Sequence, residues 1–540
     1  MNTTHSRRAS LAAACSAALA ALTLTATGAA AATVGAATAH AGSGGANPIV
    51  RTDDGFVRGM AVGAVDEFLG IPYAAPPTGN LRWRPPAPPT AWDGVRDATQ
   101  FGASCPQQPS LFAPPGPFSE DCLFLNVYTP PQGSGNEGSW PVLVWIHGGG
   151  LTQDAGRDYD GSKLAADGTV VVTINYRLGA LGFLAHPALA SSPGGPAGNY
   201  GLMDQQAALR WVQRNIGRFG GDPENVTIAG QSAGGLSVLA QMVSPGARGL
   251  FQRAIVQSGT FALNQRPLAT AEAAGETFAT AVGCPDQTAA CLRTVPVSTL
   301  VNDFGTEIPG VVDGQVLTQP IGTALASGQI ARVPVINGIT HNEELLFVDG
   351  LRMTVSQGTF IPLAAPLTPP TSEANYEADI AQALGVSPAR ATAIANVYPL
   401  SANPTRRDEV FGQAISDASF ACPALQVDQW TAARGVPTYA YQFNDDNAPV
   451  FNFGQATHGA EIPYLFDRPG KPVTLSADQQ ALAASMRTDW ARFAGTGNPS
   501  SSALPWPSFA GTRVLSLVPL ASQVTTDFAA AHNCSFWAAG

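Results

Sequence analysis

Short runs of apolar residues recur along the chain and alternate with stretches that suit helices. Such a run, bounded by turn residues, is typical of a strand buried on both faces. The pattern predicts strands over 142–146, 169–176, 225–230, 253–258, 332–339, 437–443 and 513–518. It predicts helices over 202–219, 232–243, 271–282 and 478–493. Buried strands alternating with helices indicate an α/β fold with a central, mostly parallel sheet and helices on both faces.

The N-terminus has the pattern of a cleaved secretory signal peptide. Arg7 and Arg8 precede an Ala/Leu-rich run over 11–27, and small residues follow at two possible cleavage points, after Ala32 or after Ala41. We therefore expect residues 1–41 to be removed and the protein to be secreted. Residues 42–540 show no internal repeat and no linker, so they are expected to form a single catalytic domain.

Charge and hydropathy exclude several classes of partner. The formal net charge of −11 becomes −13 once 1–41, with two arginines and no acid, is removed. A chain this acidic has no basic surface for nucleic acid. No later run approaches the roughly 20 apolar residues of a membrane span, so no membrane anchor is expected. The sequence gives no indication of oligomeric state.

Six cysteines remain after the signal peptide. An even number in an exported chain favours disulfides over metal ligation. Spacing alone suggests the local pairs Cys105–Cys122 and Cys284–Cys291. The sequence has neither a CxxC nor an HExxH motif, so we expect no metal site.

Two glycine-rich segments carry the candidate chemistry. Gly230-Gln231-Ser232-Ala233-Gly234 lies between a predicted strand and a predicted helix, where small neighbours allow a sharp turn that exposes a serine hydroxyl. His147-Gly148-Gly149-Gly150 follows an earlier strand, and its bare backbone N–H groups suit an oxyanion hole.

A serine nucleophile needs a histidine base and an acid, which follow it along the chain in α/β hydrolases. Five histidines do not fit that order, because they leave with the signal, precede the serine or leave no room for the acid (His5, His40, His147, His186 and His341). His458, in a loop with small neighbours, is favoured over His532 near the C-terminus. For the acid, the loop after strand 332–339 offers Glu343 or Glu344, and local spacing does not decide between them.

Four segments together resemble the type-B carboxylesterase/lipase family, which has the α/β-hydrolase fold. They are 219–234 around Ser232, Glu120–Asn126, Asn175–Gly179 and Asn199–Gln205. The resemblance covers most of 48–540. It implies Ser232 as nucleophile, Glu343 as acid and His458 as base.

The same resemblance implies further structural and catalytic features. Oxyanion donors are expected at Gly149, Gly150 and Ala233, and no cofactor is implied. A long-range disulfide, Cys422–Cys534, is implied beside the two local pairs. Arg82 or Arg84 is expected to pair with Glu120.

The sequence departs from the family pattern at three places. Gln231 precedes the nucleophile where many members have glutamate, and Glu344 stands where glycine is usual. No tryptophan lies between Cys105 and Cys122, where cholinesterases keep the aromatic that binds choline. The missing tryptophan, together with Gln231, argues against a cholinesterase.

We therefore predict a secreted serine carboxylesterase acting on small-molecule esters through an acyl-enzyme. The alternatives are a lipase or sterol esterase of the same family, and a non-catalytic adhesion module on the same fold. The retained serine, acid and histidine argue against the adhesion module.

Overall fold

The computed structural model describes residues 47–108, 116–131, 140–190, 197–302, 310–350, 373–502 and 504–539. The predicted signal peptide, residues 1–41, lies outside this range. The described residues pack as one compact unit. Among them, no helix is both long enough and apolar enough to cross a membrane.

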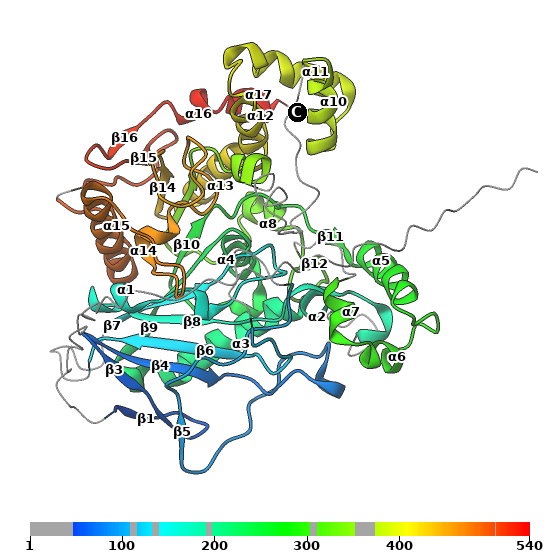
Figure 1. The fold of residues 1–540 in the computed structure, drawn as a ribbon, viewed down its shortest axis with the longest axis vertical. Coiled ribbons are helices and arrows are strands. Elements are labelled where there is room, and N and C mark those ends of the chain that lie inside the picture. The colour runs from blue at the N-terminus through cyan, green and yellow to red at the C-terminus, as the bar shows by residue number, and fades with distance from the viewer. Residues whose placement is uncertain are drawn as a thin grey trace, which may run out of the picture. The chain divides into compact units, whose positions relative to one another are not determined.

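An eleven-stranded sheet is the centre of the part of the chain that the structure describes (Figure 1). In spatial order its strands are β16 (Gln523–Thr525), β15 (Val514–Leu517), β14 (Thr438–Phe443), β13 (Val335–Thr340), β10 (Arg253–Gln257), β9 (Gly221–Gln231), β7 (Trp140–Ile146), β8 (Val170–Ile174), β6 (Phe124–Thr129), β4 (Val65–Pro72) and β3 (Met60–Val62). The strands from β15 to β8 run parallel, and antiparallel strands are added at both edges. All seven predicted strands are present.

Two smaller sheets lie outside the central one. The first pairs β1 (Ile49–Arg51), β2 (Phe56–Arg58) and β5 (Val95–Asp97), and the second pairs β11 (Arg266–Pro267) with β12 (Val311–Val312). None of these short strands was predicted.

Helices connect the strands in the order expected of an α/β protein. Their bounds are α1 (Ser162–Ala166), α2 (Gly179–Phe183), α3 (Tyr200–Asn215), α4 (Ala233–Val243), α5 (Leu268–Ala281), α6 (Ala289–Thr294), α7 (Val297–Asn302), α8 (Ile321–Ser327), α10 (Glu373–Leu384), α11 (Pro388–Val397), α12 (Arg407–Ser416), α13 (Cys422–Ala433), α14 (Ile462–Leu465), α15 (Ala477–Thr496), α16 (Phe528–Ala531) and α17 (Cys534–Ala538). The four predicted helices are α3, α4, α5 and α15. The first of them, predicted to residue 219, ends at Asn215 and continues as a 3-10 turn.

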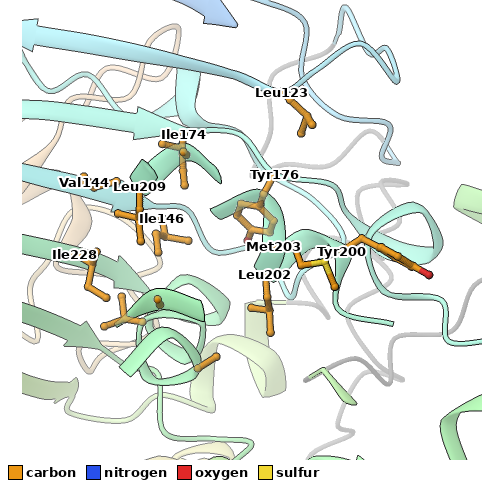
Figure 2. Close-up of a cluster of buried hydrophobic side chains, with 14 of the residues drawn as sticks. Leu123, Val144, Ile146, Ile174, Tyr176, Tyr200, Leu202, Met203, Leu209 and Ile228 are labelled. Carbon is orange, nitrogen blue, oxygen red and sulfur yellow. The ribbon is translucent and has the colours of Figure 1, made fainter. Parts of the chain in front are cut away.

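Side chains alternate between two cores along each buried strand, because successive strand residues point to opposite faces. Val144 and Ile146 of β7 pack with Ile174 of β8 and Leu209 of α3, as Figure 2 shows. The residue between them, Trp145, belongs to the opposite core, together with side chains of α1 and α15. Helices therefore cover both faces of the sheet, as the sequence predicted.

A separate helical layer has its own core. Tyr376 and Ile380 of α10, Ile394 of α11 and Phe411 of α12 are buried together there. In Figure 1, α10 and α11 lie side by side, away from the strands of the sheet.

The parallel strands end at one edge, and this edge positions the candidate chemistry. The loops after β7, β9, β10, β13 and β14 carry, respectively, Gly148–Gly150, Ser232, Ser258, Glu343 and His458. In open α/β sheets the carboxyl ends of the strands are where ligand sites form.

Candidate active site

Ser232 is the single residue between strand β9 and helix α4, and its backbone is strained. Its φ of 58° and ψ of −127° lie in a region that costs a residue with a Cβ about 1–3 kcal/mol. Neighbouring groups hold this conformation. The Ser232 N–H donates to the carbonyl of Gln257 at 2.8 Å, and the Leu236 N–H donates to the carbonyl of Ser232 at 2.9 Å.

The glycines two residues either side of Ser232 are required by close backbone packing. A Cβ at Gly230 would lie 2.5 Å from the carbonyl carbon of Gly234. A Cβ at Gly234 would lie 2.0 Å from the carbonyl oxygen of Ile146. No side chain fits at either position, so the turn that presents the serine depends on both glycines.

Glu343 and His458 form a buried acid–base pair. His458 Nδ1 lies 2.6 Å from Glu343 Oε2, and neither residue is appreciably exposed. The other carboxylate oxygen, Oε1, accepts from the hydroxyl of Ser258 at 2.6 Å and from the N–H of Thr340 at 2.8 Å. These donors fix the carboxylate, so the carboxylate in turn fixes the tautomer and orientation of the imidazole.

The surroundings of His458 favour its charged form. Burial lowers the pKa of the imidazole, but the charge and hydrogen bond of Glu343 outweigh burial and raise it above its ordinary value. Glu461 and Glu344 add to this effect. An imidazole whose charged form is stabilised accepts a proton more readily, as a general base must.

His458 Nε2, the nitrogen that should face the nucleophile, makes no hydrogen bond within the described residues. The Ser232–His458 hydrogen bond is therefore not formed in this structure. The two loops are nevertheless close, because a Cβ at Gly459 would lie 3.7 Å from Nε2 of Gln231. Catalytic hydrogen bonds are often long in ligand-free enzymes and tighten when substrate binds.

The glycine loop after β7 packs directly on the serine turn. A Cβ at Gly148 would lie 3.1 Å from the Cβ of Ser232. Gly149 and Gly150 have φ of 85° and 63°, which places them in the left-handed region that glycine adopts freely. Ala233 is the first residue of α4, so its N–H has no acceptor within the helix. The three expected oxyanion donors thus come from two segments that touch at Ser232.

Sequence reasoning missed two buried residues that connect these loops. The side-chain Nε2 of Gln257 donates to Oε1 of Glu461 at 3.0 Å. The backbone carbonyl of Gln257 accepts from the Ser232 N–H. Glu461 is fully buried, and burial, together with the charge of Glu343, raises its pKa to about 7. The available signals were the position of Gln257 at the end of the strand beside β9 and of Glu461 three residues after the histidine.

The two candidate acids and the two candidate bases have different neighbours in the structure. Glu343 contacts His458, whereas the backbone of Glu344 donates to Ser416 Oγ at 2.8 Å. Burial raises the pKa of the Glu344 carboxyl to about 7. His532 lies elsewhere, with its Nδ1 2.5 Å from Asp417 Oδ1.

The expected disulfides and ion pair are present. Cys105–Cys122, Cys284–Cys291 and Cys422–Cys534 are all bonded. Arg82, not Arg84, pairs with Glu120, and its Nε and Nη2 donate to the two carboxylate oxygens at 2.7 and 2.5 Å.

The side chain of Gln231 is buried, and its Nε2 has no partner among the described groups.

The comparisons with known proteins cover most of the chain. The sequence profile of the carboxylesterase family matches residues 46–537. The chain is 36% identical to a cocaine esterase of Homo sapiens, over 92% of each chain. It is 35% identical to a para-nitrobenzyl esterase of Bacillus subtilis (strain 168), over 85% of this chain and 92% of that one. A solved structure of a PNB esterase superposes with a TM-score of 0.75 at 32% identity, over 91% of this chain and all of that one.

Proposed function

The chain belongs to the carboxylesterase family, and on this premise we propose that it is an exported serine esterase in which Ser232, His458 and Glu343 form the catalytic triad. It is an enzyme that hydrolyses carboxylic esters. The observation that supports the proposal is that loops at one edge of the sheet carry both a strained, glycine-flanked serine and a buried Glu–His pair.

In the acylation step, His458 Nε2 takes the proton of the Ser232 hydroxyl as the oxygen attacks the ester carbonyl. The imidazolium that forms is stabilised by Glu343, 2.6 Å from Nδ1. His458 then gives the proton to the departing alcohol, and the acyl group remains on the serine. In the deacylation step, water attacks the acyl-enzyme with His458 again as base. This attack releases the carboxylic acid and restores the serine hydroxyl.

The N–H groups of Gly149, Gly150 and Ala233 receive the negative charge that develops on the carbonyl oxygen. Backbone donors that are already in place need no reorganisation during the reaction, and losing one typically costs about 10²–10³ in rate. The contact between Gly148 and Ser232 supports this assignment, because it places the glycine loop beside the nucleophile.

Fluorophosphonate labelling tests the nucleophile. Wild type should incorporate one phosphonyl group on the peptide containing Ser232, and Ser232→Ala should incorporate none. Ser485→Ala, an exposed serine of α15, is the matched control and should label like wild type. Label that persists in Ser232→Ala, or that resides on another serine, contradicts the proposal.

Rates across p-nitrophenyl esters of increasing acyl length test the substrate class. An esterase should prefer short chains and show no increase in rate when the substrate forms micelles. A marked increase at micelle formation would instead indicate the lipase alternative.

Export is proposed from the signal-like segment 1–41 and is supported by three disulfides, which persist in oxidising compartments. Expression of the full chain in a secreting bacterial host tests it. The culture medium should contain active enzyme that begins near Thr33 or Gly42. Active enzyme that retains Arg7 and Arg8 inside the cell would contradict export.

A further inference from the structure

Two adjacent residues at the carboxyl end of β10, Gln257 and Ser258, contact the loops that carry all three members of the proposed triad. β10 lies between β9, which leads into the serine turn, and β13, which leads into the acid loop. Because it pairs in parallel with both neighbours, the two loops leave the sheet on either side of its end. Both residues are fully buried. Three separate hydrogen bonds connect them to the site.

The backbone carbonyl of Gln257 fixes the nucleophile. It accepts from the N–H of Ser232 at 2.8 Å, and Ser232 is the residue with the strained backbone. Helix α4 leaves room for this carbonyl at Gly235, where a Cβ would lie 2.7 Å from the carbonyl oxygen. A strained conformation persists only where its surroundings hold it. A displacement of Gln257 would therefore move the serine.

The side chain of Gln257 reaches the histidine loop. Its Nε2 donates to Oε1 of Glu461 at 3.0 Å, and Glu461 follows His458 by three residues. Its Oε1 accepts from Nε1 of Trp490, in α15, at 3.1 Å. An indole N–H only donates, so the amide oxygen must face Trp490 and the amide nitrogen must face Glu461. The amide thus has one orientation and holds the histidine loop against β10.

The side chain of Ser258 fixes the acid. Its Oγ donates to Oε1 of Glu343 at 2.6 Å, and the other oxygen of that carboxylate lies 2.6 Å from His458 Nδ1. The φ of Ser258 is 50°, in the left-handed region that a residue with a Cβ rarely adopts. The N–H of Ser258 donates to the carbonyl of Gly338 at 2.8 Å and anchors this conformation to β13. The hydroxyl is therefore held against the carboxylate.

We propose that Gln257 and Ser258 are positioning residues that align the nucleophile, the base and the acid from the end of one strand. Gln257 holds the serine turn through its backbone and the histidine loop through its side chain, and Ser258 holds the carboxylate. The inference rests on the proposed triad. Acylation and deacylation use the same base and the same acid, so misalignment should lower kcat and leave KM nearly unchanged.

The hydroxyl of Ser258 is tested with two substitutions that separate its hydrogen bond from its backbone strain. The measurement is kcat and KM for p-nitrophenyl acetate on the plateau of the pH profile. Ser258→Ala removes the hydroxyl, so kcat should fall about 10- to 100-fold while KM stays within about threefold. Ser258→Gly also lacks the hydroxyl but adopts positive φ freely, and it should be impaired as much as Ser258→Ala.

The hydrogen bond between Gln257 and Glu461 is tested with a double-mutant cycle. Gln257→Met and Glu461→Met each remove this bond with a side chain of similar length, and each should lower kcat about tenfold. If both act through the one bond, the double variant should lose no more than the larger single loss, whereas independent effects would multiply. Glu461→Gln keeps an oxygen acceptor, so it should retain several-fold more activity than Glu461→Met.

Gln206 and Ser244 supply the matched controls. Both are buried, Gln206 Nε2 donates to Ser244 Oγ at 3.0 Å, and Ser244 follows the end of α4 that is opposite to Ser232. Gln206→Met and Ser244→Ala should lower the melting temperature but keep kcat within about twofold of wild type. Circular dichroism and thermal melting of every variant separate misalignment from unfolding.

The outcomes distinguish this inference from the proposed function. A kcat within about twofold of wild type in Ser258→Ala or Gln257→Met overturns the positioning role of that residue. Restored activity in Ser258→Gly, or losses that multiply in the double variant, overturns it as well. If Gln257→Met does not fold, equal activity of Glu461→Met and Glu461→Gln overturns the role of the side-chain bond. Failure of a fluorophosphonate to label wild type at Ser232 would overturn the proposed function itself and the inference with it.

Discussion

At the scale of single residues, the candidate site depends on backbone shape as much as on side-chain chemistry. Ser232 occupies a backbone conformation that few residues adopt, and Gly230 and Gly234 leave the space in which that turn fits. The pattern of glycines around the serine predicted the turn because the steric requirement is local. The partners of Glu343 could not be predicted, because Ser258 is 85 residues away and is brought close only by strand pairing.

Substitution of Gly234 tests the steric requirement. In Gly234→Ala the new Cβ would meet the carbonyl oxygen of Ile146 at 2.0 Å, so the turn must shift. We expect kcat/KM to fall at least 100-fold, because a displacement of about 1 Å in catalytic geometry can cost that much. Gly217→Ala is the control, since a Cβ at Gly217 meets nothing within 4 Å, and it should keep wild-type activity. Equal activity of both variants would contradict the account.

Substitution of Glu343 tests the electrostatic role of the acid. In Glu343→Gln the pKa of His458 should fall, because the lost charge is what raises it. The base must be neutral, so kcat/KM rises with pH through this pKa, and the rising limb should move to lower pH. The plateau rate should drop by up to about 10⁴, the loss seen when the acid of a serine protease triad becomes an amide.

Glu344→Gln is the comparison that separates the two adjacent acids. Glu344 raises the pKa of His458 less than Glu343 does, so the limb should move less and the plateau should change by less than tenfold. A larger loss in Glu344→Gln than in Glu343→Gln would assign the acid role to Glu344.

At the scale of elements, the sequence predicted the buried parallel strands but missed the short exposed strands and two buried strands of the antiparallel edge, β4 and β6. β7, β8 and β13 are apolar runs buried on both faces, and such runs are visible without any tertiary information. β1, β2 and β5 have three residues each and are largely exposed, so they form no apolar run. The α10–α12 layer has its own small core, and none of its helices was among those predicted.

A large-to-small substitution in the core beside the sheet should lower stability without changing catalysis. Leu209 of α3 is fully buried against β7 (Figure 2). Leu209→Ala should lower the free energy of unfolding by about 2–5 kcal/mol through lost burial and a residual cavity. Its kcat should stay within about twofold at 25 °C. Leu520→Ala, 80% exposed, is the matched control and should change stability by less than about 0.5 kcal/mol in denaturant titration.

At the scale of the whole molecule, the family resemblance contributed what local patterns did not. Spacing suggested the two local disulfides, but only the resemblance implied Cys422–Cys534, which spans 112 residues. It also implied Glu343, where spacing left Glu344 open. Gln257 and Glu461 were not found by either route, because neither belongs to a motif, and their contact depends on how the histidine loop folds over β10.

The long-range disulfide should contribute more to stability than the shortest one. Closing a longer loop removes more entropy from the unfolded chain, and losing a native disulfide typically costs about 2–5 kcal/mol. The double variant Cys422→Ser/Cys534→Ser should therefore lower the unfolding midpoint more than Cys284→Ser/Cys291→Ser, whose partners are 7 residues apart. Non-reducing denaturation followed by tryptophan fluorescence measures both. The opposite order would show that strain or local contacts dominate.

The central claim is that three groups act on one ester carbonyl: the Ser232 hydroxyl, the His458 imidazole, and the backbone N–H groups of Gly149, Gly150 and Ala233. A crystal structure of the enzyme inactivated by a phosphonate ester tests this claim most directly. The account predicts phosphorus bonded to Ser232 Oγ and a phosphoryl oxygen about 3 Å from the nitrogens of Gly149, Gly150 and Ala233. It also predicts His458 Nε2 within hydrogen-bond distance of the adduct. Phosphorus on another residue, or a phosphoryl oxygen that contacts none of these amides, would contradict it.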